Sequence, residues 1–239
     1  MSFKDIRGQD RPIRMLTGYI EQGRLGGGYL FFGPQGVGKK LVAKTLAKAV
    51  NCLEKSLDSC DRCASCAKIE NNQHPDVRII ENQDTDIKIE QIRQLQKDIS
   101  LRPYEGAKKV FIIDNAHRLT PEAPGALLKI LEEPPGASLI ILLIDKPALL
   151  FKTIISRCKI LKFLPLKNIE LKEILKKDYS LDNDTAHFLA YFSEGRLGLA
   201  LELKDTNIIR DKNSLFFRLK RNIGFYIGFN IIFRAEYKY

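Results

Sequence analysis

The stretch Gly-Tyr-Leu-Phe-Phe-Gly-Pro-Gln-Gly-Val-Gly-Lys-Lys, residues 28–40, joins a short apolar run to a glycine-rich loop, and a helically spaced apolar pattern follows over residues 37–49. Strand, loop and helix in this order are the setting that a phosphate-binding loop requires. Three glycines allow successive N–H groups to turn inward around an anion at a helix N-terminus: Gly33, Gly36 and Gly38. Lys39 is then expected to lie against the phosphates. An ordinary glycine turn without a ligand is the alternative interpretation.

Lys40 stands where this motif calls for Ser or Thr, whose hydroxyl normally ligates Mg²⁺. A lysine supplies no oxygen, and its ammonium repels a divalent cation if it faces the metal position. The sequence therefore predicts that Mg²⁺ does not bind, and it leaves ATP binding open.

A second nucleotide signature follows at residues 109–115, Lys-Val-Phe-Ile-Ile-Asp-Asn. Asp114, at the end of an apolar strand, can help to hold a metal beside the loop. Active members of this class place Glu next, to activate water, whereas Asn115 has no basic oxygen. We expect no ATPase activity of the isolated chain. A plain buried strand that ends in a turn is the alternative.

Four of the five cysteines follow the pattern C-x7-C-x2-C-x2-C: Cys52, Cys60, Cys63 and Cys66. Two-residue gaps let neighbouring thiolates converge on one tetrahedral ion, so the pattern predicts structural zinc in an insertion over about residues 52–70. An iron–sulfur cluster and a set of inert reduced thiols are the alternatives.

Composition points to a folded protein with an anionic partner. Hydrophobic residues make up 44% of the chain, charged residues 28%, and Lys and Arg exceed Asp and Glu by ten. No run approaches 18 apolar residues, and the N-terminus has no signal-peptide core. We expect a cytoplasmic protein without a membrane partner, and the positive charge favours nucleic acid.

Apolar periodicity predicts strands that alternate with helices, and hence a parallel sheet covered by helices on both faces, in an α/β fold. The further strands are expected at residues 76–80, 109–113, 138–144 and 159–163. Two amphipathic helical patterns follow, at residues 169–176 and 182–192. Residues 206–239 form a basic, aromatic-rich tail.

Several motifs together resemble bacterial clamp-loader subunits, within the AAA+ ATPases: GPQGVGKK, the cysteine cluster, VFIIDNAH, ALLKILEEPP and Ser156-Arg157-Cys158. The resemblance covers residues 1 to about 203. It implies a three-layer P-loop domain over residues 1–165 with the zinc insertion, and a small all-helical lid over residues 166–205. Such proteins usually end in a helical collar domain, for which this chain has no room. The tail is then a truncated collar, a partner-binding segment or sequence with no selected structure.

The resemblance also implies a function in DNA replication, as part of the DNA polymerase III holoenzyme, a DNA-directed DNA polymerase. The expected partners are the gamma/tau and delta subunits, the sliding clamp and primed DNA. Lys40 and Asn115 favour a non-hydrolysing subunit that supplies Arg157 in trans as an arginine finger to a neighbouring ATPase. Arg196 falls where the family places a nucleotide-sensing arginine. The rival readings are an active gamma/tau-like ATPase and a zinc-dependent DNA-binding protein with a relic nucleotide fold.

Overall fold

The computed structural model describes residues 1–54, 56–81 and 86–206, and it divides the chain into two compact units that meet between Leu166 and Lys167. Each unit is described by itself. The predictions for the tail lie outside the described residues, apart from residue 206.

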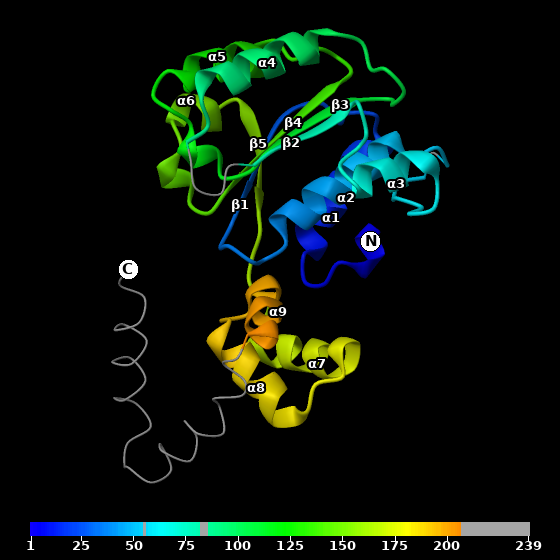
Figure 1. The fold of residues 1–239 in the computed structure, drawn as a ribbon, viewed down its shortest axis with the longest axis vertical. Coiled ribbons are helices and arrows are strands. Elements are labelled where there is room, and N and C mark those ends of the chain that lie inside the picture. The colour runs from blue at the N-terminus through cyan, green and yellow to red at the C-terminus, as the bar shows by residue number, and fades with distance from the viewer. Residues whose placement is uncertain (55, 82–85, 207–239) are drawn as a thin grey trace. The chain divides into compact units, whose positions relative to one another are not determined.

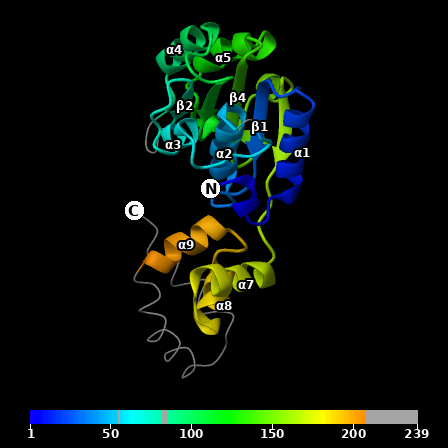
Figure 2. The same cartoon turned by 90° about the vertical axis from the view of Figure 1, so that its right-hand side faces the viewer.

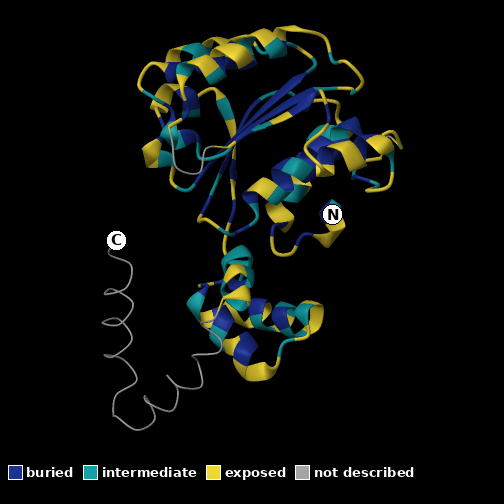
Figure 3. Cartoon of the chain, viewed as in Figure 1, coloured by how far each residue is buried: buried dark blue, intermediate teal, exposed yellow. Residues whose placement is uncertain are grey.

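The first unit is built on a parallel sheet with the strand order β2-β3-β4-β1-β5. The strands are β1 (Gly27–Phe32), β2 (Val77–Ile80), β3 (Lys109–Ile113), β4 (Ser138–Ile144) and β5 (Cys158–Lys162). β3 and β4 are buried along their whole length (Figure 3), as expected of strands that are covered on both faces. β5 lies at one edge, and three of its five residues are exposed.

Helices cover both faces of this sheet (Figure 1), and a ninety-degree turn of the view shows the same layers (Figure 2). One face carries α1 (Asp10–Glu21), α2 (Lys39–Asn51) and α3 (Ala64–Glu70); the other carries α4 (Ile89–Ser100), α5 (Ala123–Glu132) and α6 (Lys152–Ile155). Alternate residues of β1 serve the two cores. Tyr29 and Phe31 pack with Leu46 of α2, and Leu30 packs with Leu127 of α5.

The described part of the second unit is all-helical and contains α7 (Asn168–Tyr179), α8 (Asn183–Phe192) and α9 (Leu197–Asp205). Asp182 caps α8 by accepting hydrogen bonds from the N–H groups of Asp184 and Thr185. Buried Leu171, Leu175 and Leu189 form the centre of the packing.

The predicted fold class is confirmed: a parallel sheet between two helical layers, followed by a helical unit. Two of the predicted strands differ from the observed ones by one residue at their ends, because β2 begins at Val77 and β5 spans Cys158–Lys162. Among the described residues, no helix is both long and apolar enough to cross a bilayer.

Candidate functional site

The carboxyl ends of the parallel strands bring charged residues together at one edge of the sheet. The glycine-rich loop follows β1, and Glu81, Asp114 and Asp145 follow β2, β3 and β4 directly. Ligands of open α/β sheets bind at this edge. The structure thus brings the loop and Asp114 to the same edge.

The loop runs from Gly33 to Gly38 and ends where α2 begins at Lys39. Gly33 lies against the backbone after β5, where an added Cβ would meet the carbonyl oxygen of Phe163 at 2.2 Å. Gly36 and Gly38 have φ values of 81° and 97°, in the region that favours glycine. All three predicted glycines therefore have backbone geometries that suit the turn.

The Lys39 side chain is held by its own chain, and the residue is only 8% exposed. Its ammonium donates to the carbonyl oxygens of Gly33 and Pro34, and it lies 2.8 Å from Oδ1 of Asp145. Sequence reasoning missed Asp145. The signal was present, because an acidic residue directly after a buried parallel strand is the same pattern that identified Asp114.

Lys40 forms ion pairs with two carboxylates at the edge. Its ammonium lies 2.6 Å from Oε2 of Glu81 and 3.7 Å from Oδ2 of Asp114. The other oxygen of Asp114 accepts the N–H of Asn115 at 2.9 Å. Both oxygens of the predicted metal carboxylate thus already face donors of this chain, and a lysine supplies the positive charge.

The four predicted cysteines converge. Their Sγ atoms all lie within 4.8 Å of one another, and Cys52 and Cys66 are buried. Sγ of Cys60 accepts the N–H of Cys63 at 3.3 Å, and Sγ of Cys63 accepts the N–H of Cys66 at 3.4 Å. Burial opposes ionisation of Cys63, but hydrogen bonds from the backbone of Cys66 and Leu53 outweigh it and lower its pKa to about 6. These four cysteines could hold a metal ion.

The fifth cysteine, Cys158, lies apart from the cluster, at the start of β5. Burial raises the pKa of this thiol to about 12, so that it stays protonated. It belongs to the sheet and not to the cluster.

One lysine attaches the cysteine module, residues 52–70, to helix α2. The Lys48 side chain is 2% exposed, and its ammonium lies 2.6 Å from Oδ1 of Asp61 and 2.9 Å from Oε2 of Glu70. It also donates to the carbonyl oxygen of Met1 at 2.8 Å. Because α2 begins at the loop lysine, the same helix carries the glycine-rich loop and the module.

Arg157 lies between α6 and β5, directly before the amino end of β5. Its Nη2 lies 2.6 Å from Oε1 of Glu132, and its Nη1 donates to the carbonyl oxygen of Thr153 at 3.0 Å. Arg196, in the second unit, precedes α9; its Nε donates to the carbonyl oxygen of Ser193 at 2.9 Å. Each predicted arginine is thus held by its own unit.

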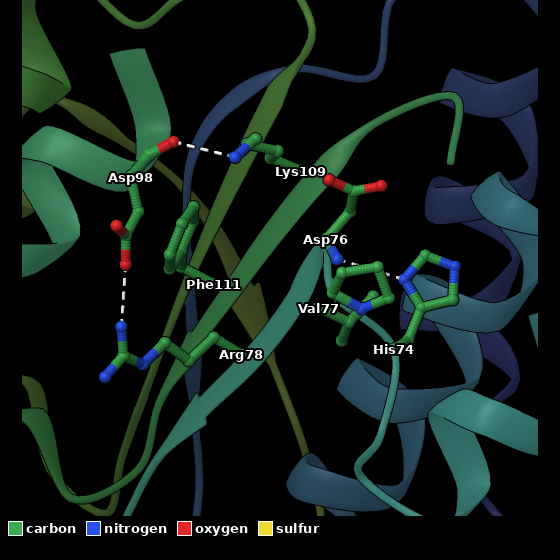
Figure 4. Close-up of a pocket in the computed structure, with 8 residues that line it drawn as sticks. His74, Asp76, Val77, Arg78, Asp98, Lys109 and Phe111 are labelled. Atoms are coloured by element: carbon green, nitrogen blue, oxygen red, sulfur yellow. Dashed lines mark hydrogen bonds and ion pairs between the residues drawn. The ribbon is translucent and has the colours of Figure 1, made fainter. Parts of the chain in front are cut away.

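A cavity of about 300 Å³ lies at the amino ends of β2 and β3 (Figure 4). Its charged groups are matched internally: Arg78 pairs with Asp98 at 2.6 Å, and Lys109 donates to the carbonyl oxygen of Asp98. Asp76 donates its N–H to Nδ1 of His74, and its carboxylate accepts three backbone N–H groups of residues 104–106. No predicted site residue lines this cavity, and its contacts fix a turn.

The fold and the residues at the strand edge together define an α/β domain with a phosphate-binding loop. The fold is similar to that of the RuvB Holliday junction branch migration motor of Thermotoga maritima, with a TM-score of 0.60 and 20% identity; the match covers 90% of this chain and 65% of that one. This likeness concerns the fold alone.

The family model described as DNA polymerase III, delta subunit, matches residues 8–167, and the chain belongs to that family. It is 38% identical over 173 residues to DNA polymerase III subunit delta' of Bacillus subtilis, and this match covers 72% of this chain and 53% of that protein. It is also 36% identical over 208 residues to subunit gamma/tau of Mycoplasma pneumoniae, over 85% of this chain and 30% of the relative.

The chain spans about half the length of the delta' relative and about a third of the gamma/tau relative. The resemblance to clamp-loader subunits, and in particular to the delta-prime subunit, is confirmed by these matches. Because the chain is similar to both subunit types, the choice between a delta' and a gamma/tau function depends on the residues of the site.

Proposed function

We propose that this chain is a non-hydrolysing, delta-prime-like subunit of the DNA polymerase III clamp loader. In this role it acts in the cytoplasm with gamma/tau and delta subunits, and it helps to load the sliding clamp on primed DNA. Membership in the delta subunit family supports the assignment to this complex.

The ion pairs of Lys40 are the observation that carries the non-hydrolysing role. For Mg²⁺ to use Asp114, it has to displace an ammonium 3.7 Å away, or share the site with it. The repulsion between two unit charges at about 4 Å is roughly 4 kcal/mol at a surface-like dielectric, and a divalent ion doubles it. Lys40 is partly exposed and can turn away, so these values are upper limits. Its partner Glu81, however, holds it at the edge.

Asn115 supports the same conclusion independently. Its side-chain amide has no basic oxygen to accept a proton from attacking water, which a Glu at this position supplies in active enzymes. Without this base and without the metal hydroxyl ligand, bound ATP is not turned over. The four loop residues are then relics of a nucleotide site, or they hold nucleotide without magnesium: Gly33, Gly36, Gly38 and Lys39.

Steady-state phosphate release by the isolated chain tests this role. We expect turnover at the background level of a protein-free control, with or without Mg²⁺. An active gamma/tau subunit measured in parallel is the positive control. Turnover comparable with that subunit would establish the rival function, an active ATPase, for which the similarity to gamma/tau proteins speaks.

We propose that Arg157 acts in trans on a neighbouring ATPase subunit. Its side chain is 35% exposed and therefore within reach of a partner. Its planar fork of donors suits the γ-phosphate of ATP held by a neighbouring subunit, and arginine fingers supplied in trans raise turnover by about 10³–10⁵. In a reconstituted clamp loader, R157A should lower ATP turnover at least tenfold, and R157K should not restore it. Unchanged turnover with R157A in an intact complex rules the trans role out.

We further propose that the cysteine cluster holds structural zinc. The donor set fits, because four thiolates at mutual distances below 4.8 Å suit tetrahedral coordination, and the two backbone N–H donors stabilise thiolate charge. Cys52, Cys60, Cys63 and Cys66 would supply all four ligands. The metal then contributes to folding and leaves no coordination position for catalysis.

A further inference from the structure

The guanidinium of Arg157 is oriented by two elements of its own unit. Thr153 of α6 accepts Nη1 at 3.0 Å, and Glu132 at the end of α5 lies 2.6 Å from Nη2. α5 and α6 lie side by side on one face of the sheet (Figure 1). A side chain that has to meet a phosphate at a fixed geometry benefits from such prior orientation.

Glu132 is placed where a helix disfavours it. It is the last residue of α5, and the C-terminal end of a helix carries partial negative charge that repels a carboxylate. Glu133, the next residue, is exposed as well and carries the same charge. Of these two glutamates, Glu132 is the one 2.6 Å from a guanidinium nitrogen, so its position is explained by Arg157 and not by the helix.

A glycine in β1 allows the end of α5 to approach the start of β5. Gly28 pairs with Cys158 in the sheet. A Cβ at Gly28 would meet Cδ2 of Leu131 at 2.5 Å, Sγ of Cys158 at 3.2 Å and the carbonyl oxygen of Arg157 at 3.3 Å. Leu131 and Arg157 therefore both lie against this one position, and their neighbour Glu132 comes within reach of the guanidinium.

We propose that Glu132 is a positioning residue for Arg157: it holds the guanidinium toward the surface before a neighbouring subunit presents its ATP. This inference rests on the proposed trans role of Arg157. The two side chains are 35% and 48% exposed, so the pair is weak enough to loosen when a more highly charged phosphate arrives. Glu132 then acts through the arginine and makes no contact with ATP itself.

The test is a set of variants in a reconstituted clamp loader with ATP, the sliding clamp and primed DNA: E132A, E132Q, E133A, R157A and E132A/R157A. We expect E132A to lower kcat about two- to fivefold and to leave KM unchanged. Loss of an exposed ion pair lowers the population of the oriented Arg157 side chain by about this factor. E132Q keeps the length of the side chain and should lower kcat less. E133A, the matched control at the same helix end, should equal the wild type.

The double variant separates positioning from a general structural effect. If Glu132 acts only through Arg157, E132A/R157A has the same kcat as R157A alone. Co-purification of each variant with the other subunits shows that the complex is intact. Wild-type kcat for both E132A and E132Q, while R157A is impaired, overturns this inference and leaves the proposed function standing; so does a further loss in the double variant. Unchanged kcat for R157A overturns both.

Discussion

Replacing Lys48 by Met tests how the cysteine module is joined to the helix that carries the glycine-rich loop. Met keeps most of the apolar stem of the side chain and removes the ammonium. Lys48 is 2% exposed and contacts Asp61 at 2.6 Å, Glu70 at 2.9 Å and the carbonyl oxygen of Met1 at 2.8 Å. The variant removes the cation that the two carboxylates share, and it leaves Asp61 with the N-terminal ammonium at 3.0 Å and Glu70 with Lys44 at 3.4 Å.

The expected cost follows from the burial of the three groups. Removing one partner of a fully buried ion pair costs about 3–5 kcal/mol. Here the lysine is buried, but Asp61 and Glu70 are 31% and 54% exposed and recover part of their hydration. We therefore expect K48M to lower the free energy of unfolding by about 2–3 kcal/mol.

Urea unfolding of the full chain, purified without chelator and followed by circular dichroism, measures this difference at pH 7. K176M is the matched control, because Lys176 is 38% exposed and contacts Glu173 at 3.4 Å on the surface of α7. That variant should change the free energy of unfolding by less than about 0.5 kcal/mol.

The difference between wild type and K48M should also depend on pH. The hydrogen bond from Lys48 lowers the pKa of Glu70. Burial opposes the charge of Asp61, but the interactions with Lys48, the N-terminal ammonium and Ser59 together outweigh burial and lower its pKa. Carboxylates with depressed pKa values contribute stability above their unfolded values, about 4, and lose it as the pH falls through their folded values. Burial opposes the charge of Lys48, but the two carboxylates raise its pKa overall, so its contribution is present below about pH 10.4.

The gap between the two proteins should therefore be full between about pH 5 and 10 and narrow below pH 4. The reasoning fails if K48M unfolds within about 0.5 kcal/mol of the wild type at pH 7, or if the gap does not narrow in acid.

Two further predictions concern the predicted metal positions. K40T restores the hydroxyl of the motif and frees Glu81 and Asp114 from the ammonium. Calorimetry should then show that the variant binds ATP at least about tenfold more tightly with Mg²⁺ than with EDTA, whereas the wild type should show no dependence on Mg²⁺. The same Mg²⁺ dependence in both proteins counts against the role given to Lys40. C63S should abolish a zinc content of about one per chain and lower the melting temperature, whereas C158S should keep the metal; zinc-free wild-type protein, purified without chelator, contradicts the assignment.

Local patterns were enough to predict the strands of the first unit and the helix that follows the glycine-rich loop. A few neighbouring residues are enough to predict a strand or a turn, because periodicity and glycine content act locally. This holds for the strand and loop of residues 28–38 and for the apolar run of residues 138–144. The cysteine spacing predicted convergence for the same reason. The second nucleotide signature, an apolar strand that ends in Asp, also predicted Asp114 beside the loop.

Contacts between distant segments were beyond such patterns. Lys39 and Asp145 are separated by 106 positions, and no periodicity links them. The spacing of the motif identified Lys40 as the unusual residue, but the direction of a flexible side chain depends on which carboxylates surround it. In the fold, those are Glu81 and Asp114.

The amino-acid sequence by itself determined the strands, the glycine-rich loop, the helix after it and the set of cysteines, since each depends on residue types a few positions apart. Tertiary structure decided which charges meet: Lys40 with two strand-end carboxylates, Lys48 with the cysteine module and Arg157 with Glu132. The physical reason is that ion pairs act over a few ångströms in space, and only the packed sheet and helices bring these side chains within that distance.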